Sequence, residues 1–325
     1  MGDPAKLLII GEPRANDQAE ESRLAADQEF RKALHLHRLW LNKQEGGARA
    51  SLHELELVNP QIAALNLSFA VLSGISFARG SLHGAVFEGA EIEQCDWEDV
   101  DLLDADFSRA EVSRCRFPFA NLNSATLVEG KFQNVQMPEA RLVGAHCIEA
   151  FFSRCDFGLT LAQKSSWNRA RLIECHFGES DLTNSVWYGA QCQFVRFPKA
   201  NLNAVNGSRS RFLHCEFQYS QLRHARFSGA DLSGSQFVHC DLTEADLRQT
   251  NLSSASFRDA TLWGARLEGA NLRGADLRGA NLQGARELSA AQLLQARTDK
   301  DTILPNGSGG PYMKFSGAER TRRAG

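Results

Sequence analysis

The chain has 325 residues, of which 43% are apolar and 23% charged, and its formal net charge is −3. The near balance of 36 basic and 39 acidic residues gives no whole-chain electrostatic reason to bind nucleic acid or an anionic membrane surface. No run of about 18 apolar residues occurs, and the start has only the short apolar stretch 7–10, so neither a membrane span nor a signal-peptide core is expected. We therefore expect a cytoplasmic protein, and export through a system that needs no cleaved signal stays open.

Residues 1–49 form an N-terminal segment with an amphipathic pattern. Apolar residues recur among charged ones between Asn16 and Leu41, which is typical of a helix with one apolar face. These apolar residues are Leu24, Phe30, Ala33, Leu34, Leu36, Leu39 and Trp40. We expect this helix to cap the first coil of the region that follows; the alternative is a helix that binds a partner.

Residues 50–285 repeat with a period of five. Steps of five from Leu52 to Leu282 meet 47 positions in one unbroken register, and nearly all of them are large and apolar. The weak members are Met137, Cys147, Ala162, Cys192 and Gly207. A second series, mostly of small residues, lies two positions before the first, as at Ala85 and Ala90. Neither a helix nor a strand keeps a five-residue register over this length, so the pattern predicts a solenoid.

Similar residues also recur every 20 positions, which predicts coils of four quintets with four sides. One inward column is aromatic from Phe77 to Phe257, with Met137 as its exception, and the next is nearly all leucine from Leu82 to Leu262. Prolines and glycines follow the aromatic column and predict a turn at that corner. About 12 coils, stacked at about 4.8 Å, would make a rod about 55 Å long with a filled core.

Several quintets carry a family resemblance. The segments 230–234, 270–274 and 275–279 read Ala-Asp-Leu-Ser-Gly, Ala-Asn-Leu-Arg-Gly and Ala-Asp-Leu-Arg-Gly. They resemble the A(D/N)LxX motif of the pentapeptide-repeat family, and the register covers about 235 residues. The resemblance implies a right-handed quadrilateral β-helix, in which the large residue and the small residue two before it point inward. The quintets from about 110 to 220 depart most from the motif, which suggests faces adapted to a partner.

The C-terminal part is expected to close the solenoid and then to become flexible. Ser289 precedes the apolar residues of 290–296 as a candidate N-cap, so residues 286–305 are expected to hold a short capping helix and a strand-like end. Residues 306–325 lack apolar periodicity and are expected to form a mobile tail.

The sequence indicates no catalytic, cofactor or metal site. Five of the eight cysteines fall in one inward column, at positions 95, 115, 155, 175 and 215, which favours buried small side chains over zinc ligands. No nucleophile motif or phosphate-binding glycine loop occurs. A square rod also presents flat faces instead of the concave pocket that an enzyme needs, so we expect a non-enzymatic protein without cofactors.

The charges along the repeats are unevenly distributed. Residues 50–140 hold 14 acidic and 5 basic residues, residues 141–226 hold 6 and 11, and residues 227–285 hold 7 and 5. Nine acids without an intervening base make an acidic belt of about one coil: Glu88, Glu91, Glu93, Asp96, Glu98, Asp99, Asp101, Asp104 and Asp106. Four bases spaced by 40 residues are expected on one face, namely Arg169, Arg171, Arg209 and Arg211. Outward residues 20 apart, such as Asp96 and Arg116, are expected to pair by sign.

These features predict a bacterial-type scaffold, effector or accessory protein that presents charge-banded faces to a protein partner. The belt and the four arginines are the candidate partner-binding residues. The alternative is a regulator or protector of a type II topoisomerase such as gyrase, because the resemblance includes proteins thought to imitate duplex DNA, commonly as dimers. Such mimicry needs acidity along most of the rod, whereas this rod has a basic middle. No direct nucleic-acid binding is expected, and a homodimer is possible.

Overall fold

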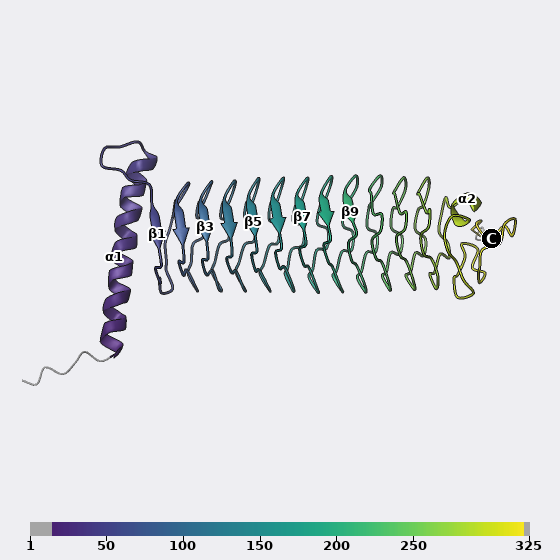
Figure 1. Ribbon diagram of the computed structural model, residues 1–325, viewed down its shortest axis with the longest axis horizontal. Coiled ribbons are helices and arrows are strands. Elements are labelled where there is room, and N and C mark those ends of the chain that lie inside the picture. Colours follow the sequence, from purple (N-terminus) through teal and green to yellow (C-terminus); the bar gives the residue numbers. More distant parts are fainter. Residues whose placement is uncertain (1–14, 322–325) are drawn as a thin grey trace, which may run out of the picture.

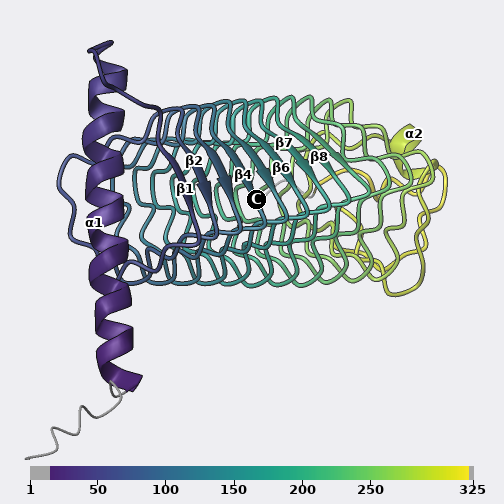
Figure 2. The same ribbon diagram turned by 60° about the vertical axis from the view of Figure 1, so that its left-hand side comes forward.

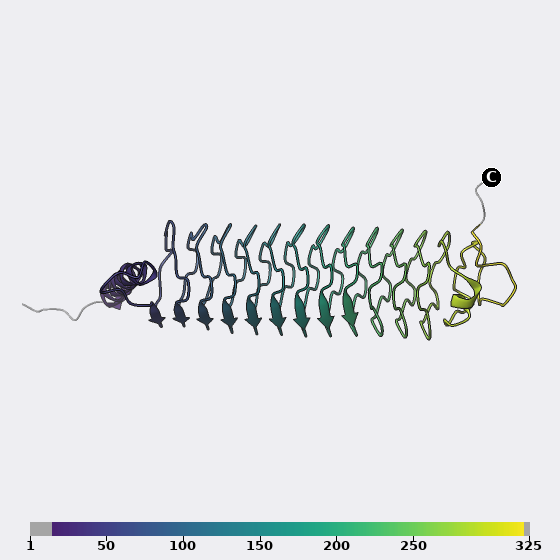
Figure 3. The ribbon, with the colours of Figure 1, turned by 90° about the horizontal axis from the view of Figure 1, so that it is seen from above.

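The computed structural model describes residues 15–321, and side-chain surroundings from Ala25 onward. The chain is an elongated rod with helix α1 (Ala15–Leu41) across one end and the short helix α2 (Ala290–Leu293) at the other (Figure 1). Three-residue strands line one side of the rod (Figure 3). They are β1 (Ser51–His53), β2 (Val71–Ser73), β3 (Glu91–Glu93), β4 (Glu111–Ser113), β5 (Lys131–Gln133), β6 (Phe151–Ser153), β7 (Arg171–Ile173), β8 (Gln191–Gln193) and β9 (Arg211–Leu213).

All pairing in the solenoid follows the 20-residue period. Each strand is parallel to the next, as in Leu52 opposite Leu72, and the other three sides pair through isolated parallel bridges such as Glu56 with Ser76. This confirms the all-β solenoid with one quintet on each side. The extent of the sheet differs from the twelve coils expected. The nine-stranded sheet spans eight turns from β1 to β9, and beyond β9 the pairing of the described residues continues as isolated bridges, of which the last parallel one joins Asn281 to Ile303.

The inward columns form the core that the five-residue register predicts. The large position is buried throughout, weak members included, except that Ile62 is half-buried beneath α1. In the aromatic column, Phe157, Phe177 and Phe197 stack with ring centroids 4.5 and 5.1 Å apart. Trp167 and Trp187 stack at 4.9 Å in the column on the opposite side of the coil. Each ring therefore buries its area against rings of the coils before and after it.

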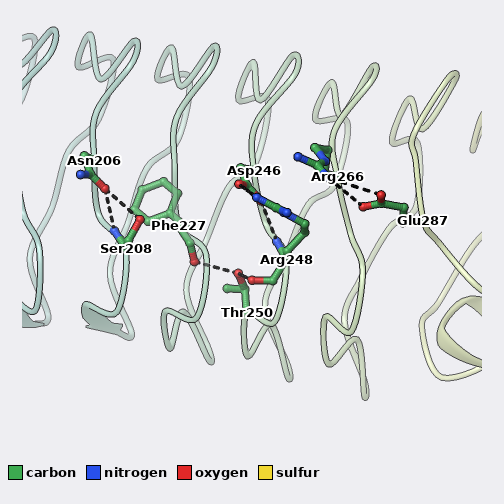
Figure 4. A network of polar contacts seen from close by, with 8 residues as sticks. All are labelled: Asn206, Ser208, Phe227, Asp246, Arg248, Thr250, Arg266 and Glu287. Carbon is green, nitrogen blue, oxygen red and sulfur yellow. Dashed lines mark hydrogen bonds and ion pairs between the residues drawn. The ribbon is translucent and has the colours of Figure 1, made fainter.

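Each side turns into the next through a residue with positive φ, two positions after the large inward residue. Glycine fits this conformation without strain, as at Gly189, but Asp99 (φ 52°) and Arg169 (φ 56°) also adopt it. Asn and Asp one position before the large residue stabilise the turn, because their side chains accept the N–H two residues on. Figure 4 shows this for Asn206, which accepts from the N–H of Ser208 at 3.2 Å.

Buried hydroxyls replace alanine at some small inward positions, and they donate to backbone carbonyl oxygens except for Ser185, whose hydroxyl accepts the Trp187 Nε1–H at 2.8 Å. The Thr250 hydroxyl donates to the Phe227 carbonyl oxygen at 2.8 Å (Figure 4). Outside the core in the same view, Arg248 binds Asp246 at 2.6 Å and Arg266 binds Glu287 at 3.3 Å. The Arg248 hydrogen bond lowers the pKa of Asp246. The Thr250 hydroxyl and these two acid–base pairs thus all have hydrogen-bond or ion-pair partners within the protein, as buried and half-buried polar groups generally do.

Helix α1 covers the first coils, as Figure 2 shows. Phe30 is 2% exposed and meets Phe77 edge to face, with ring centroids 6.1 Å apart. His37 is fully buried, and its Nδ1 accepts the Ala50 N–H at 3.0 Å where the chain enters the solenoid. The described part of the predicted amphipathic helix is thus confirmed, and it packs on the solenoid end; residues 1–14 lie outside the described residues.

His37 makes the cap sensitive to pH. Burial is the largest cause that lowers the pKa of His37, the charge of Arg49 adds to it, and the Ser68 backbone offsets it in part. Because the folded pKa is below the unfolded value of about 6.5, the cap keeps its full stability above about pH 6.5 and loses it as the pH falls. We expect the protection factors of the α1 amides, which are exchange rates corrected for the intrinsic pH dependence of exchange, to be lower at pH 5 than at pH 7.5. His37→Gln, which keeps an acceptor for Ala50, should remove that difference; an equal pH response in this variant would contradict the role of His37.

The C-terminal end closes the last coil. Ser289 caps α2 in a reciprocal arrangement with Gln292, as the sequence predicts, and the Gln292 amide donates to the carbonyl oxygens of Leu267 (2.7 Å) and Ala270 (2.9 Å). In the segment expected to be a tail, the Asn306 N–H donates to the Ala318 carbonyl oxygen at 3.2 Å. The mobility of residues 306–321 stays a prediction, and 322–325 lie outside the described residues.

All eight cysteines are free and buried, which confirms their inward placement. Burial raises the pKa of Cys215 to about 12 and that of Cys240 to about 12. Cys155 and Cys175 are neighbours in the column; burial chiefly raises the pKa of Cys155, whereas the hydrogen bond with Cys155 chiefly lowers that of Cys175.

We expect the cysteines of the native protein to react slowly with thiol reagents. Thiolate is the reactive form, and a thiol inside a stacked coil is closed to reagent whatever its pKa. Titration with a chromogenic disulfide should find little fast labelling before denaturant is added and eight thiols afterwards. Fast stoichiometric labelling of Cys155 and Cys175 would show that their column faces solvent.

Candidate interaction surfaces

The described part of the chain offers surfaces in place of a metal centre. Within residues 15–321, no group of three or more His, Cys, Asp or Glu side chains is arranged to hold a metal ion. No helix in the same range is long and apolar enough to cross a membrane. The candidate functional features are therefore the charged and apolar groups on the four sides of the rod.

Four acids of the belt lie beside basic side chains from outside the belt. Glu88, Glu91 and Glu93 form ion pairs with Arg109 (3.5 Å), Arg49 (2.8 Å) and Arg114, respectively, and the Asp104 carboxylate lies 3.7 Å from His83 Nε2. Three of these pairs join residues 21 apart in sequence. A step of 20 residues leads to the same position in the next coil, and one further residue leads to the turn beside it, where the two side chains reach each other. Residues 88–106 contain no basic residue in sequence, but in the folded rod basic side chains from outside this stretch lie beside some of its acids.

The acidity that is left gathers on one corner of the belt coil. Asp96, Glu98, Asp99 and Asp101 occupy two adjacent sides and the turn between them, and none forms an ion pair with a described residue. Arg79 lies one coil away on the same corner, outside ion-pair distance. We call these four residues the acidic corner. Asp106, also without an ion pair among the described residues, lies on the next side and accepts the Ser108 N–H at 2.8 Å.

The predicted pairing by sign between residues 20 apart occurs at several positions, although not for the pair Asp96 and Arg116. Asp96 and Arg116 are register neighbours but form no ion pair, since the Asp96 carboxylate accepts the N–H of Glu98 at 3.2 Å. Longer acids and bases do reach each other across one coil, on the strand ladder for Glu111 with Lys131 and at the turns for the others. These pairs are Glu111 with Lys131 (2.7 Å), Glu149 with Arg169 (3.0 Å), Arg154 with Glu174 (2.9 Å) and Glu179 with Lys199 (3.0 Å).

The four candidate arginines divide into two kinds. Arg169 and Arg209 lie at one corner two coils apart; Arg169 binds Glu149, and Arg209 donates to the Tyr188 hydroxyl at 3.2 Å. Arg171 and Arg211 lie on strands β7 and β9, with Gln191 of β8 between them in register. All four thus share one region of the rod, as their spacing predicts.

An open, mostly apolar hollow lies at another corner. It has a volume of about 460 Å³ and lies where Gly158 and Gly178 leave room between Pro138 and Pro198. Leu159 lines it and is 51% exposed. The sequence marks this corner by its glycines and prolines, but that signal predicts a turn and does not predict a hollow.

Models of known families match three parts of the chain. The description "Pentapeptide repeats (8 copies)" matches residues 81–118 and 120–158, and "Pentapeptide repeat region" matches 210–286. These matches fall on the solenoid whose quintets each form one side. The chain belongs to the pentapeptide-repeat family. This pentapeptide-repeat protein has no match among curated proteins.

Solved structures similar to this pentapeptide-repeat protein include three proteins with different roles. QnrB1, a plasmid-mediated fluoroquinolone resistance protein, is 17% identical over 68% of this chain and 94% of its own, with a TM-score of 0.28. HetL, involved in heterocyst differentiation regulation in the cyanobacterium Nostoc, is 22% identical over 84% and 97%, with a TM-score of 0.22. The A-module of the mannuronan C-5 epimerase AlgE4 of Azotobacter vinelandii is 9% identical over 82% and 89%, with a TM-score of 0.25.

Proposed function

We propose that this pentapeptide-repeat protein is a non-enzymatic scaffold that binds a protein partner through charged surfaces of the rod. The observation that carries the proposal is the uneven pairing of charge. Most long acids and bases at the turns bind each other across coils, whereas the acidic corner and Arg171 with Arg211 remain without ion pairs among described residues. Unpaired charges that a rigid surface holds in place are available to a partner of complementary charge.

The core supports a rigid binding surface. Stacked rings run from Phe157 to Phe257 at centroid distances of 4.5 to 5.1 Å, and each coil is hydrogen bonded to the next. Close-packed interiors resist deformation. A rigid scaffold loses little conformational freedom on binding, so exposed charges can contribute to affinity at small entropic cost.

The composition of the open hollow also supports a non-enzymatic role. Asp156 and His176 both line it, but Asp156 accepts the Gly158 N–H at 2.9 Å. The residues that line the hollow include no serine, threonine or cysteine to act as a nucleophile beside them. The pair is better explained by turn stabilisation than by acid-base chemistry.

The DNA-mimic alternative has less support, because Arg171 and Arg211 interrupt the acidic surface that imitation of duplex DNA requires. A gyrase supercoiling assay separates the two functions. We expect no effect of the purified protein on supercoiling at concentrations that saturate its partner. Inhibition or protection of gyrase that is lost on reversing the acidic corner would favour the mimic.

The scaffold proposal is tested by reversing charge at the acidic corner. Glu98→Lys with Asp99→Lys should weaken partner capture about tenfold or more and leave the melting temperature unchanged, because both side chains point outward. The matched control is Glu268→Lys with Glu139→Lys, which changes the same charge at the same two quintet positions elsewhere. Equal capture by both variants and the wild type would exclude the acidic corner as the interface.

A further inference from the structure

Strands β7, β8 and β9 enclose a small hollow on the strand side of the rod. It has a volume of about 200 Å³. Arg171, Gln191 and Arg211 make one row of its outward side chains, and Ile173, Gln193 and Leu213 make the parallel row two residues further along each strand. One row therefore holds only hydrogen-bond donors and acceptors, and the other is apolar at both ends.

Neither Arg171 nor Arg211 forms an ion pair with a carboxylate among the described residues. Asp231 is the register neighbour of Arg211 in the next coil, but it forms no ion pair with Arg211, and its Oδ1 accepts the Ser233 N–H at 3.1 Å and the Asn251 side-chain amide at 2.9 Å. Glu174, three residues after Arg171, binds Arg154 at 2.9 Å. Glu149 binds Arg169 at the adjacent corner. Both guanidinium groups are thus exposed and available, as are the two glutamine amides, which form no hydrogen bond to a described residue.

The spacing of the arginines suits one anion. Two parallel strand steps separate their backbones, about 9 to 10 Å, so two long side chains can converge over Gln191. The planar guanidinium fork binds carboxylate and phosphate oxygens with two hydrogen bonds, and the Gln191 amide adds a further donor.

The row formed by Ile173, Gln193 and Leu213 indicates which kind of molecule bears the anionic group. Along a strand, side chains two residues apart on one face are separated by about 6.6 Å, which equals the repeat of an extended peptide lying beside it. An acidic residue over Gln191 would therefore place an apolar residue over Gln193, between Ile173 and Leu213. A nucleic acid offers phosphates but no apolar side chain at this spacing, so it would not use the apolar row.

We propose that the hollow between β7 and β9 is an oxyanion site that binds a carboxylate or phosphate group on an extended peptide segment, with an apolar residue two positions from the anionic one. This proposal rests on the proposed function and specifies the chemistry of the partner. It assigns direct binding to Arg171 and Arg211 and leaves Arg169 and Arg209 in structural contacts.

Fluorescence anisotropy with three labelled peptides tests the site. The peptides are Gly-Ser-X-Ser-Leu-Ser-Gly, in which X is glutamate, phosphoserine or glutamine. We expect the glutamate or the phosphoserine peptide to bind more tightly than the glutamine peptide, and the tighter of the two shows which oxyanion the site prefers. Arg171→Gln with Arg211→Gln should weaken that binding about tenfold or more, since charged hydrogen bonds are lost.

The matched control is Arg169→Gln with Arg209→Gln, which removes the same charge from the neighbouring corner. It should change binding less than about twofold. Equal loss in both variants would show unspecific attraction, and equal affinity for all three peptides would show that no oxyanion site exists; either result overturns the proposal. Partner capture that still depends on the acidic corner would then leave the scaffold function standing.

Discussion

Phe177→Asp should abolish the cooperative folding of the solenoid. The ring stacks between Phe157 and Phe197 and also touches Trp167 and Trp187 edge to face. Removing a buried phenylalanine ring costs about 3 to 5 kcal/mol, and a carboxylate without a partner in this core adds the cost of its desolvation. We expect the far-ultraviolet circular dichroism melt to lose its sharp transition.

Ser228→Asp provides the control for this change, because Ser228 lies at an outward position of the same register and is half-exposed. Its melting temperature should stay within about 2 °C of the wild type, as for most surface substitutions. Equal melts of the two variants would contradict the assignment of inward and outward positions.

Phe30→Asp should detach helix α1 and expose the first coil. Phe30 is the buried aromatic residue of the cap, and its partner Phe77 belongs to the aromatic column of the core. A solenoid end without its cap leaves an apolar layer and unpaired strand groups open to water, which favours end-to-end association. We expect a rise in apparent mass by light scattering and proteolytic release of the helix.

Gln28→Asp introduces the same charge two residues away at an exposed position of α1. This variant should remain capped and resist the protease as the wild type does. If Phe30→Asp kept its helix protected and its apparent mass unchanged, α1 would not be needed to close the solenoid.

Most of the fold could be predicted from the sequence because the five-residue register carries it. Inward positions must be apolar in every coil, so even Cys192 and Gly207 are identified as buried by their place in the register. The extent of continuous strands could not be predicted in this way. Small differences in backbone geometry decide whether one side of a coil forms a three-residue strand or only an isolated bridge. Quintets with the same sequence pattern occur in both forms, so the pattern does not distinguish them.

The candidate surfaces were only partly predictable. The sequence places Arg169, Arg171, Arg209 and Arg211 in one region, but it does not distinguish the two with partners from the two without. That distinction depends on the length and direction of side chains one coil away, such as Glu149 and Tyr188. In the belt, a search for opposite charges 20 or 21 residues apart would have found Arg109 and Arg114.

The dependence of partner affinity on salt tests the central claim most directly. The affinity of the purified protein for its captured partner should be measured from about 0.05 M to about 1 M salt, over which the screening length falls from more than 10 Å to about 3 Å. An interface built on the acidic corner and on Arg171 with Arg211 predicts a loss of about tenfold or more in affinity, and a smaller loss in variants with either group reversed. An affinity that does not change with salt would contradict the account.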